Sequence, residues 1–231
     1  MCGFFAFSTG KSAREIAELF GVTNLPHSLN DIESLKYYPK SHIPTISKNS
    51  PNTFKMRYWS LIPKWWNKSP SELSFSTFNA RSEEISEKTT YKNAWKSGQR
   101  CLIPATWFYE FKKEKLQTGK TVSLPYRVET KDAGIFTLAG LYETSEIDSI
   151  LFESVTILTC ASVGTLKPIH DRQPIIIKPQ DREFWLNNSS ALSDIVQLLL
   201  PDPTLAVHAI NSEFNKTFGK NVTAEMVRGS A

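Results

Sequence analysis

The sequence predicts an α+β fold in which mostly antiparallel strands form the core and helices flank it. Strand-like runs dominate the second half of the chain without alternating regularly with helical runs, which argues against a doubly wound parallel sheet. The sequence also lacks a Gly-rich phosphate-binding loop, so no nucleotide cofactor is expected. The 231 residues are predicted to form one domain, with a core over about residues 2–215 and a polar C-terminal tail.

The chain is expected to begin with a strand followed by an amphipathic helix. The apolar run GFFAF over residues 3–7 predicts the strand. Ser12 and Glu15 have the spacing of a capping box, and Gly21 can end a helix in the left-handed conformation. These signals predict a helix over residues 8–21.

The remainder of the first half predicts loops, one strand and one helix. Residues 24–50 contain three prolines and little periodicity, which indicates extended loop with a short strand near residues 42–46. Alternating apolar residues predict a strand over 52–63, which runs into a loop over 64–70. A helix is expected over 82–98, with Gly98 as its end.

The second half is expected to be rich in strands. The predicted strands cover residues 100–113, 124–130, 134–144, 153–162 and 172–179. Two helices are predicted to follow, over residues 179–187 and 190–200.

Composition restricts the classes of function. A net charge of +4 and an isoelectric point near 8.9 permit a nucleic-acid partner without requiring one. The three cysteines are an odd number with no metal-like spacing, so neither a disulfide framework nor a metal site is expected, and Cys101 and Cys160 are predicted to be core residues. No stretch has the length of a signal peptide or a membrane span, which favours a cytoplasmic protein.

Cys2 lies directly behind the initiator methionine. A side chain this small permits removal of Met1 by the processing aminopeptidase, which would make Cys2 the first residue. Its α-amine and thiol would then lie on adjacent carbons, and each would be partly in its reactive form near neutral pH. The alternative is that Cys2 is an unreactive residue at the start of a strand.

Two polar side chains stand in apolar strand runs. In WFYEFKK, Glu110 is surrounded by aromatic residues; burial would raise its pKa toward neutrality and suit it to general acid and base catalysis. Alternatively, Glu110 is a half-exposed residue of an edge strand. In KPIHDRQPIII, His170 could carry protons and Arg172 could bind a phosphate, although a charged turn before a strand is equally consistent with the pattern.

Two further motifs are candidates for binding. In FNARSEE, Asn79 offers an amide and Arg81 a cation, or Asn79 serves only as a turn residue. In PKWWNK, Trp65 and Trp66 lie between two lysines, a pattern suited to stacking on single-stranded nucleic acid. Adjacent tryptophans can equally be core residues.

Taken in order, the motifs MCG, NAR, IPATWFYEFKK, TCAS and IHDRQP resemble those of the SOS-response-associated peptidase (SRAP) family of abasic-site processing proteins. The resemblance spans roughly residues 2–215. It implies a barrel-like β core and a monomer that binds single-stranded DNA containing abasic sites. It also implies a cytoplasmic protein, associated with the nucleoid when bound to DNA, that needs no cofactor or metal.

The resemblance also implies chemistry at Cys2. The amine of Cys2 would condense with the aldehyde of an opened abasic deoxyribose, and its thiolate would close a five-membered thiazolidine. In that scheme Asn79 would position the amine or sugar, Glu110 would shuttle protons, and His170 would assist opening of the sugar. The DNA contacts implied are Gly3, Trp65, Trp66, Arg81, Thr159 and Arg172. Release of Met1 by the protein itself is a further implied activity.

The sequence departs from the family pattern at two places. Phe4 follows MCG where the family usually has an arginine that contacts DNA, and KYYPKSHIP stands where the family has YNVAP, so no asparagine lies near Pro39. DNA affinity or site geometry is therefore expected to differ from the family pattern.

Two other functions compete with the covalent one. Class II glutamine amidotransferases also begin with cysteine and glycine, and they use the thiol to attack an amide. The continuation CGFFAF lacks their short Gly-containing motif. The other alternative is a non-enzymatic DNA-binding module in which Cys2 has no chemical role.

Overall fold

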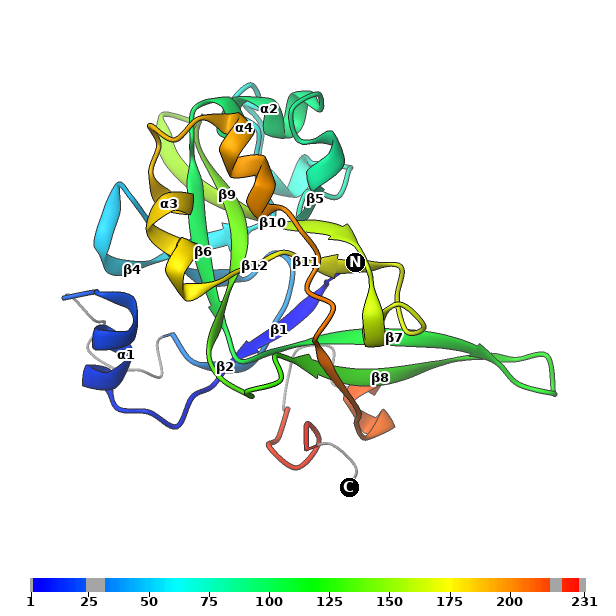
Figure 1. The fold of residues 1–231 in the computed structure, drawn as a ribbon. Helices are drawn as coiled ribbons and strands as arrows, with labels where there is room; N and C mark the ends of the chain where they lie inside the picture. Colours follow the sequence, from blue (N-terminus) through cyan, green and yellow to red (C-terminus); the bar gives the residue numbers. More distant parts are fainter. Residues whose placement is uncertain (1, 24–31, 217–221, 229–231) are drawn as a thin grey trace.

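The computed structural model describes residues 2–23, 32–216 and 222–228, whose strands form two sheets (Figure 1). Five strands of the larger sheet close a barrel, because β10 pairs with both β4 and β9 while β3 and β6 complete the ring. The barrel strands are β3 (His42–Ser47), β4 (Ser50–Trp59), β6 (Arg100–Ala105), β9 (Phe136–Ile147) and β10 (Ile150–Ala161). All pairs in the ring are antiparallel except β4–β10, which confirms the predicted α+β class with a barrel-like core.

Three short strands extend the barrel beside β10 and β9. They are β5 (Asn79–Arg81), β11 (Arg172–Pro174) and β12 (Ile176–Ile177). β5 pairs in parallel and β11 antiparallel with the last residues of β10. The segments that carry Asn79 and Arg172 are thereby fixed on either side of the same strand end.

The second sheet has five strands in the order β13, β8, β7, β1 and β2. They are β1 (Phe4–Phe7), β2 (Ser34–Tyr37), β7 (Trp107–Lys115), β8 (Thr121–Glu129) and β13 (Ala206–Ala209). β1 pairs with β7 through Phe4 and Tyr109, so the start of the chain runs alongside the strand that carries Glu110. In Figure 1 the N-terminal end lies beside β11, above β7.

Four α-helices flank the described parts of the sheets: α1 (Ala13–Phe20), α2 (Thr89–Lys96), α3 (Arg182–Leu186) and α4 (Leu192–Ile195). The predicted first helix is confirmed with both hydrogen bonds of its capping box, and Gly21 ends it with φ 64°. None of the helices in the described residues is both long and apolar enough to cross a bilayer.

The helix predicted over residues 82–98 is wrong in its first half. Ser82–Glu84 form a 3-10 turn, and α2 begins at Thr89 after an extended Lys88. The turn is tied to the barrel by Glu83, which pairs with Arg172, and such tertiary contacts override helix propensity. The two later predicted helices are likewise shortened, because 3-10 turns occupy Pro179–Asp181 and Val196–Leu198.

Three strands were not predicted, and two predicted strands are divided. β2 lies in the region expected to be mostly loop, β5 lies at the motif NAR, and β13 follows the last predicted helix. β2 and β13 are edge strands that each pair with a single neighbour, and β5 pairs with β10. The predicted strand 100–113 divides at Thr106, whose N–H donates to Ala6 O at 2.8 Å. The predicted strand 172–179 divides at Ile175. Its N–H donates to Leu158 O of β10 and its carbonyl oxygen accepts from Ala139 N–H of β9, as the chain passes from β10 to β9.

The main core joins the barrel to one face of the second sheet. Phe5 and Phe108 of that sheet pack in the same buried cluster as Trp59 and Leu138 of the barrel. A smaller cluster around Tyr109 and Phe214 covers the outer face of the second sheet. Cys101 and Cys160 lie in the main cluster, which confirms that they are core residues.

Candidate active site

Four segments distant in sequence converge where the two sheets meet. Cys2 precedes β1, Asn79 opens β5, Glu110 lies in the middle of β7, and His170 precedes β11. Asn79 contacts Cys2, Glu110 acts electrostatically on Cys2, and His170 lies beside Glu110. The structure therefore brings together the four residues that the sequence motifs marked as candidates for chemistry.

Cys2 is completely buried, with Sγ 3.8 Å from the carbonyl oxygen of Phe4. Burial raises the pKa of the thiol well above its usual range, and the nearby Glu110 carboxylate raises it further. The side chain is therefore held in this structure as a neutral thiol. Burial alone matches the alternative that Cys2 is merely a core residue, so its chemical role depends on the polar groups around it.

Asn79 connects the barrel to the N-terminal residue. Its Nδ2 donates to the carbonyl oxygen of Cys2 at 2.7 Å, while its own backbone carbonyl accepts from the hydroxyl of Tyr91 at 3.0 Å. The Oδ1 atom of Asn79 is buried and has no hydrogen-bond partner among the described residues. A buried amide oxygen without a donor is costly, so this atom is available to accept from a group that binds beside Cys2.

Glu110 is buried, with only 2% of its surface exposed. The alternative of a half-exposed edge residue is therefore wrong: β7 is an interior strand at this point, between β1 and β8. Burial raises the pKa of Glu110 to about 8. A carboxyl group that titrates near neutrality can both donate and accept a proton at physiological pH, as predicted from its aromatic neighbours.

His170 faces Glu110 with one ring nitrogen, and the other lies beside Arg172 and Asp171. Nε2 lies 3.7 Å from Glu110 Oε2. Nδ1 accepts from the backbone N–H of Arg172 at 3.0 Å and lies 3.0 Å from Asp171 Oδ1. Burial lowers the pKa of His170, so the neutral ring is favoured at pH 7.

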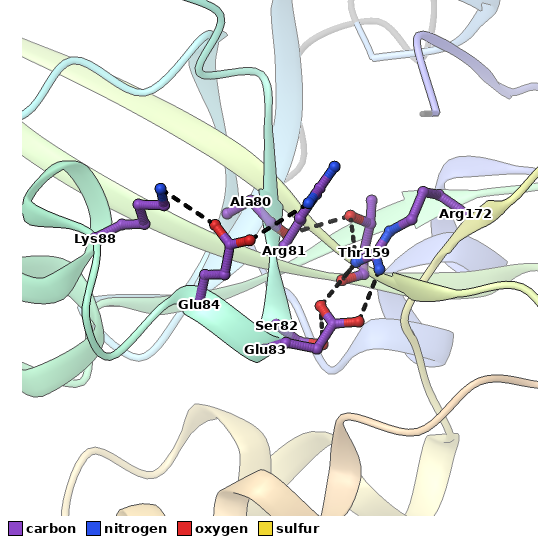
Figure 2. Close-up of polar contacts among 8 residues, drawn as sticks. All are labelled: Ala80, Arg81, Ser82, Glu83, Glu84, Lys88, Thr159 and Arg172. Carbon is purple, nitrogen blue, oxygen red and sulfur yellow. Dashed lines mark hydrogen bonds and ion pairs between the residues drawn. The ribbon is translucent and has the colours of Figure 1, made fainter.

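Arg172 is held in place by a carboxylate and a carbonyl group (Figure 2). Its two terminal nitrogens donate to the Glu83 carboxylate at 2.7 and 2.9 Å, and Nη2 also donates to Thr159 O at 2.7 Å. These hydrogen bonds lower the pKa of Glu83 to about 2. Arg172 is thus pre-oriented at the end of β10, two residues from His170.

Thr159 and Arg81 complete this group. Thr159 is fully buried and donates to Ala80 O at 3.3 Å, so it lies behind Arg172 rather than on the surface. Arg81 is exposed, and its contact with Glu84 is long, at 3.4 Å. Figure 2 shows Lys88 on the other side of Glu84. An exposed arginine with one weak partner can exchange that partner for a phosphate, so Arg81 remains the more accessible candidate for DNA binding.

The two tryptophans of PKWWNK lie on a surface loop. Trp65 is 54% exposed, which is inconsistent with a core role, while Trp66 is half-buried. Their ring centroids are 6.0 Å apart, and Trp66 also contacts Phe75, which is 42% exposed. Exposed aromatic rings in a loop with two lysines form a surface suited to base stacking.

Gly3 and Phe4 lie next to Cys2. Gly3 is half-buried, and Phe4 turns its ring to the outer face of the second sheet, against Phe111 at 6.0 Å. The ammonium of Lys36 lies 4.4 Å from the centroid of the Phe4 ring, and burial lowers the pKa of this lysine to about 8. The position at which the resemblance implies an arginine is thus part of an apolar cluster that contains a buried lysine.

Sequence reasoning missed Glu83 as a part of the site. Its only signal is the acidic pair that follows NAR, which resembles an ordinary solvated turn. Within the described residues, no group of three or more His, Cys, Asp or Glu side chains could hold a metal ion.

Comparison with known proteins identifies the relatives of this chain. A family model described as SOS response associated peptidase (SRAP) matches residues 1–217. The abasic site processing protein YoqW of Bacillus subtilis is 32% identical over 205 residues, covering 87% of this chain and 86% of that protein. The abasic site processing protein HMCES of Xenopus tropicalis is 27% identical over 209 residues, covering 83% of this chain and 60% of that protein.

A similar structure has also been solved. A crystal structure of a protein from Bacteroides thetaiotaomicron covers 100% of both chains with a TM-score of 0.84 at 22% identity. At that identity the likeness supports the fold and carries no information about activity.

Proposed function

Because this chain belongs to the SOS response associated peptidase (SRAP) family, we propose that it processes abasic sites in single-stranded DNA through a covalent bond to Cys2. The observation that carries the proposal is the hydrogen bond from Asn79 to the Cys2 carbonyl, beside Glu110 and His170. A nucleophile, a positioning amide and two proton carriers are therefore within one small region.

The reaction requires that Met1 is removed, so that Cys2 carries a free α-amine. The amine attacks the aldehyde carbon of the opened deoxyribose, and the resulting carbinolamine loses water to give an imine. The sulfur of Cys2 then adds to the same carbon while the thiol proton passes to the nitrogen. One water molecule is released overall, and the product is a thiazolidine that joins protein and DNA.

Burial determines the order of these steps. The raised pKa of the Cys2 thiol disfavours the thiolate, so the amine is the first nucleophile and the sulfur follows. Glu110, with a pKa of about 8, is largely protonated at pH 7 and can donate to the hydroxyl that departs from the carbinolamine. The unpartnered Oδ1 of Asn79 can accept a hydrogen bond from the amine, which orients its lone pair toward the aldehyde.

His170 has a different role in this scheme. Its neutral ring can exchange a proton with the sugar as the cyclic form opens to the aldehyde, and can reverse that transfer when the adduct is released. Arg81 and Arg172 bind flanking phosphates, and Trp65 stacks on a neighbouring base. These contacts are to the backbone or to ring faces, so binding is independent of sequence.

The covalent bond is tested with single-stranded DNA that contains one abasic site. Protein whose intact mass confirms the loss of Met1 is expected to give a heat-stable adduct on a denaturing gel, and undamaged DNA none. Cys2→Ala should abolish the adduct completely, whereas Cys101→Ala, which removes a buried thiol from the barrel, should leave the yield unchanged. An equal yield with Cys2→Ala would contradict the proposal.

The same experiment separates the competing functions. Binding of abasic DNA without any covalent product, in protein that lacks Met1, would indicate a non-enzymatic binding module. Release of ammonia from glutamine, dependent on Cys2, would indicate an amidohydrolase. Cys2→Ser should give a less stable adduct than wild type, because a hydroxyl can close only the less stable oxazolidine ring.

A further inference from the structure

The β7–β8 hairpin projects from the body of the molecule beyond the candidate active site (Figure 1). The first half of β7 is buried and carries Glu110, whereas the residues from Lys113 to Thr121 are all exposed. This outer half contains lysines at 112, 113, 115 and 120 and a single carboxylate, Glu114. The hairpin is thus a positively charged extension of the strand that holds the proposed acid and base.

The register of the hairpin assigns its side chains to two faces. Glu110 pairs with Tyr126 and Lys112 with Leu124, so these residues share one face because side chains alternate along a strand. Lys113 pairs with Ser123, and Lys115 with Thr121, on the opposite face. On this face Tyr126 lies directly across from Glu110, and Lys112 and then Glu114 follow outward along β7. Tyr126 and Lys112 are partly exposed.

The spacing on this face fits a nucleic-acid strand. Residues two apart on a strand are about 6.8 Å apart, and the flexible stem of lysine adds reach. The ammonium of Lys112 can therefore contact the phosphate next to a sugar held at Glu110. Tyr126, directly across from Glu110 on β8, is partly exposed, so a sugar or base can pack against its ring.

We propose that Lys112 and Tyr126 extend the DNA-binding surface along one face of the hairpin, on one side of the abasic site. Lys112 binds the adjacent phosphate, and Tyr126 packs against the nucleotide that carries it. The inference rests on the proposed function, since the occupant is the strand that carries the abasic sugar. Lys113 and Lys115, on the other face, make no contact with that strand.

The test compares two neighbouring lysines of the same hairpin. Binding of single-stranded DNA with a non-reactive tetrahydrofuran analogue of the abasic site is measured across salt concentrations for wild type, Lys112→Gln and Lys113→Gln. Each variant loses one positive charge. Lys112→Gln should bind more weakly and flatten the slope of log K against log salt by about 0.7, the value for one lost phosphate contact on a single strand. Lys113→Gln should keep the wild-type slope.

Two further measurements sharpen the comparison. Tyr126→Leu should weaken binding without changing the salt slope, because it removes a ring and no charge. With the analogue placed at the 5′ end or at the 3′ end of the oligonucleotide, Lys112→Gln should weaken binding in only one of the two cases, since the hairpin lies on one side of the site. Thermal melting of each variant provides the control for folding.

The outcomes distinguish this inference from the proposed function. Wild-type protein that cross-links to abasic DNA, together with equal salt slopes for Lys112→Gln and Lys113→Gln, would overturn the hairpin surface alone. Wild-type protein that neither binds nor cross-links would overturn the proposed function and this inference with it.

Discussion

The residues assigned to chemistry and those assigned to binding differ sharply in their surroundings. Cys2 and Glu110 are 0% and 2% exposed, where the start of the chain runs alongside β7. Trp65 and Phe75 are 54% and 42% exposed, on a loop that packs against the barrel through Trp66. Proton transfer depends on groups whose pKa values have been moved by loss of water, whereas stacking on DNA needs open ring faces.

This contrast explains why substitutions in the two regions should have different consequences. A change at the buried site around Cys2 and Glu110 alters pKa values and the free energy of unfolding together, because the same desolvation determines both. A change in the exposed loop should alter DNA affinity with little effect on stability. The predictions below test that separation, from the largest expected effect to the smallest.

Loss of the buried carboxyl group should have the largest effect on rate. Glu110→Gln keeps the shape of the side chain but removes its acid and base function, so adduct formation and its reversal should both slow by about 10² to 10⁴-fold. Glu143→Gln is the matched control, since Glu143 is also buried with a raised pKa but contacts Asn93 of α2. A time course of adduct formation, followed by transfer to competing abasic DNA, measures both directions.

His170→Ala tests whether the two proton carriers have separate roles. Its loss should slow cross-linking on the same scale and also leave the preformed adduct harder to release, because the ring acts on the sugar. Wild-type kinetics in both variants, with folding confirmed, would reduce Glu110 and His170 to structural groups and leave Cys2 as the only catalytic residue.

The stability of the chain that retains Met1 should depend on pH through Glu110. The pKa is raised from about 4.3 in the unfolded chain to about 8 in the fold, so the native state holds a proton that the unfolded state releases between these values. Stability is therefore fully present below pH 4.3 and is lost as pH rises toward 8, at about 1.4 kcal/mol per pH unit.

Urea unfolding at pH 5.5 and 7.5 measures this linkage. Relative to Glu110→Gln, wild type should lose about 2 to 3 kcal/mol of unfolding free energy between the two pH values. Groups that do not interact with Glu110 titrate equally in the two proteins, so the difference reports Glu110 and its coupling to Cys2 and His170. Parallel pH profiles of stability in the two proteins would show that the Glu110 carboxyl group is solvated, like a carboxyl group on the surface.

Substitution in the exposed loop should have the smallest effect, and it should change DNA affinity rather than stability. Trp65→Ala should weaken binding of single-stranded DNA by about 1 to 3 kcal/mol while leaving the unfolding free energy nearly unchanged. Leu151→Ala removes another exposed apolar side chain, 72% exposed on the β9–β10 hairpin, and should change neither quantity. A large loss of stability in Trp65→Ala with unchanged DNA affinity would reverse the assignment of this loop.

The features predicted correctly from the sequence depend on residues close together in the chain. The capping box of Ser12 and Glu15 spans three residues, and the aminothiol of Cys2 lies within one residue. The alternating runs predicted most barrel strands, because the period of a strand is visible in a short window. β2, β5 and β13 were missed, since strands of three or four residues are too short to show that alternation.

The environment of the site was decided by contacts that no local window contains. Glu110 is buried because β1 and β8 enclose β7, Asn79 reaches Cys2 across 77 positions, and Arg172 reaches Glu83 across 89. Sequence supplied the carboxyl, amide and guanidinium groups, which are properties of single residues. Their protonation, partners and exposure follow from desolvation and from distances between segments, and those quantities exist only once the two sheets have packed together.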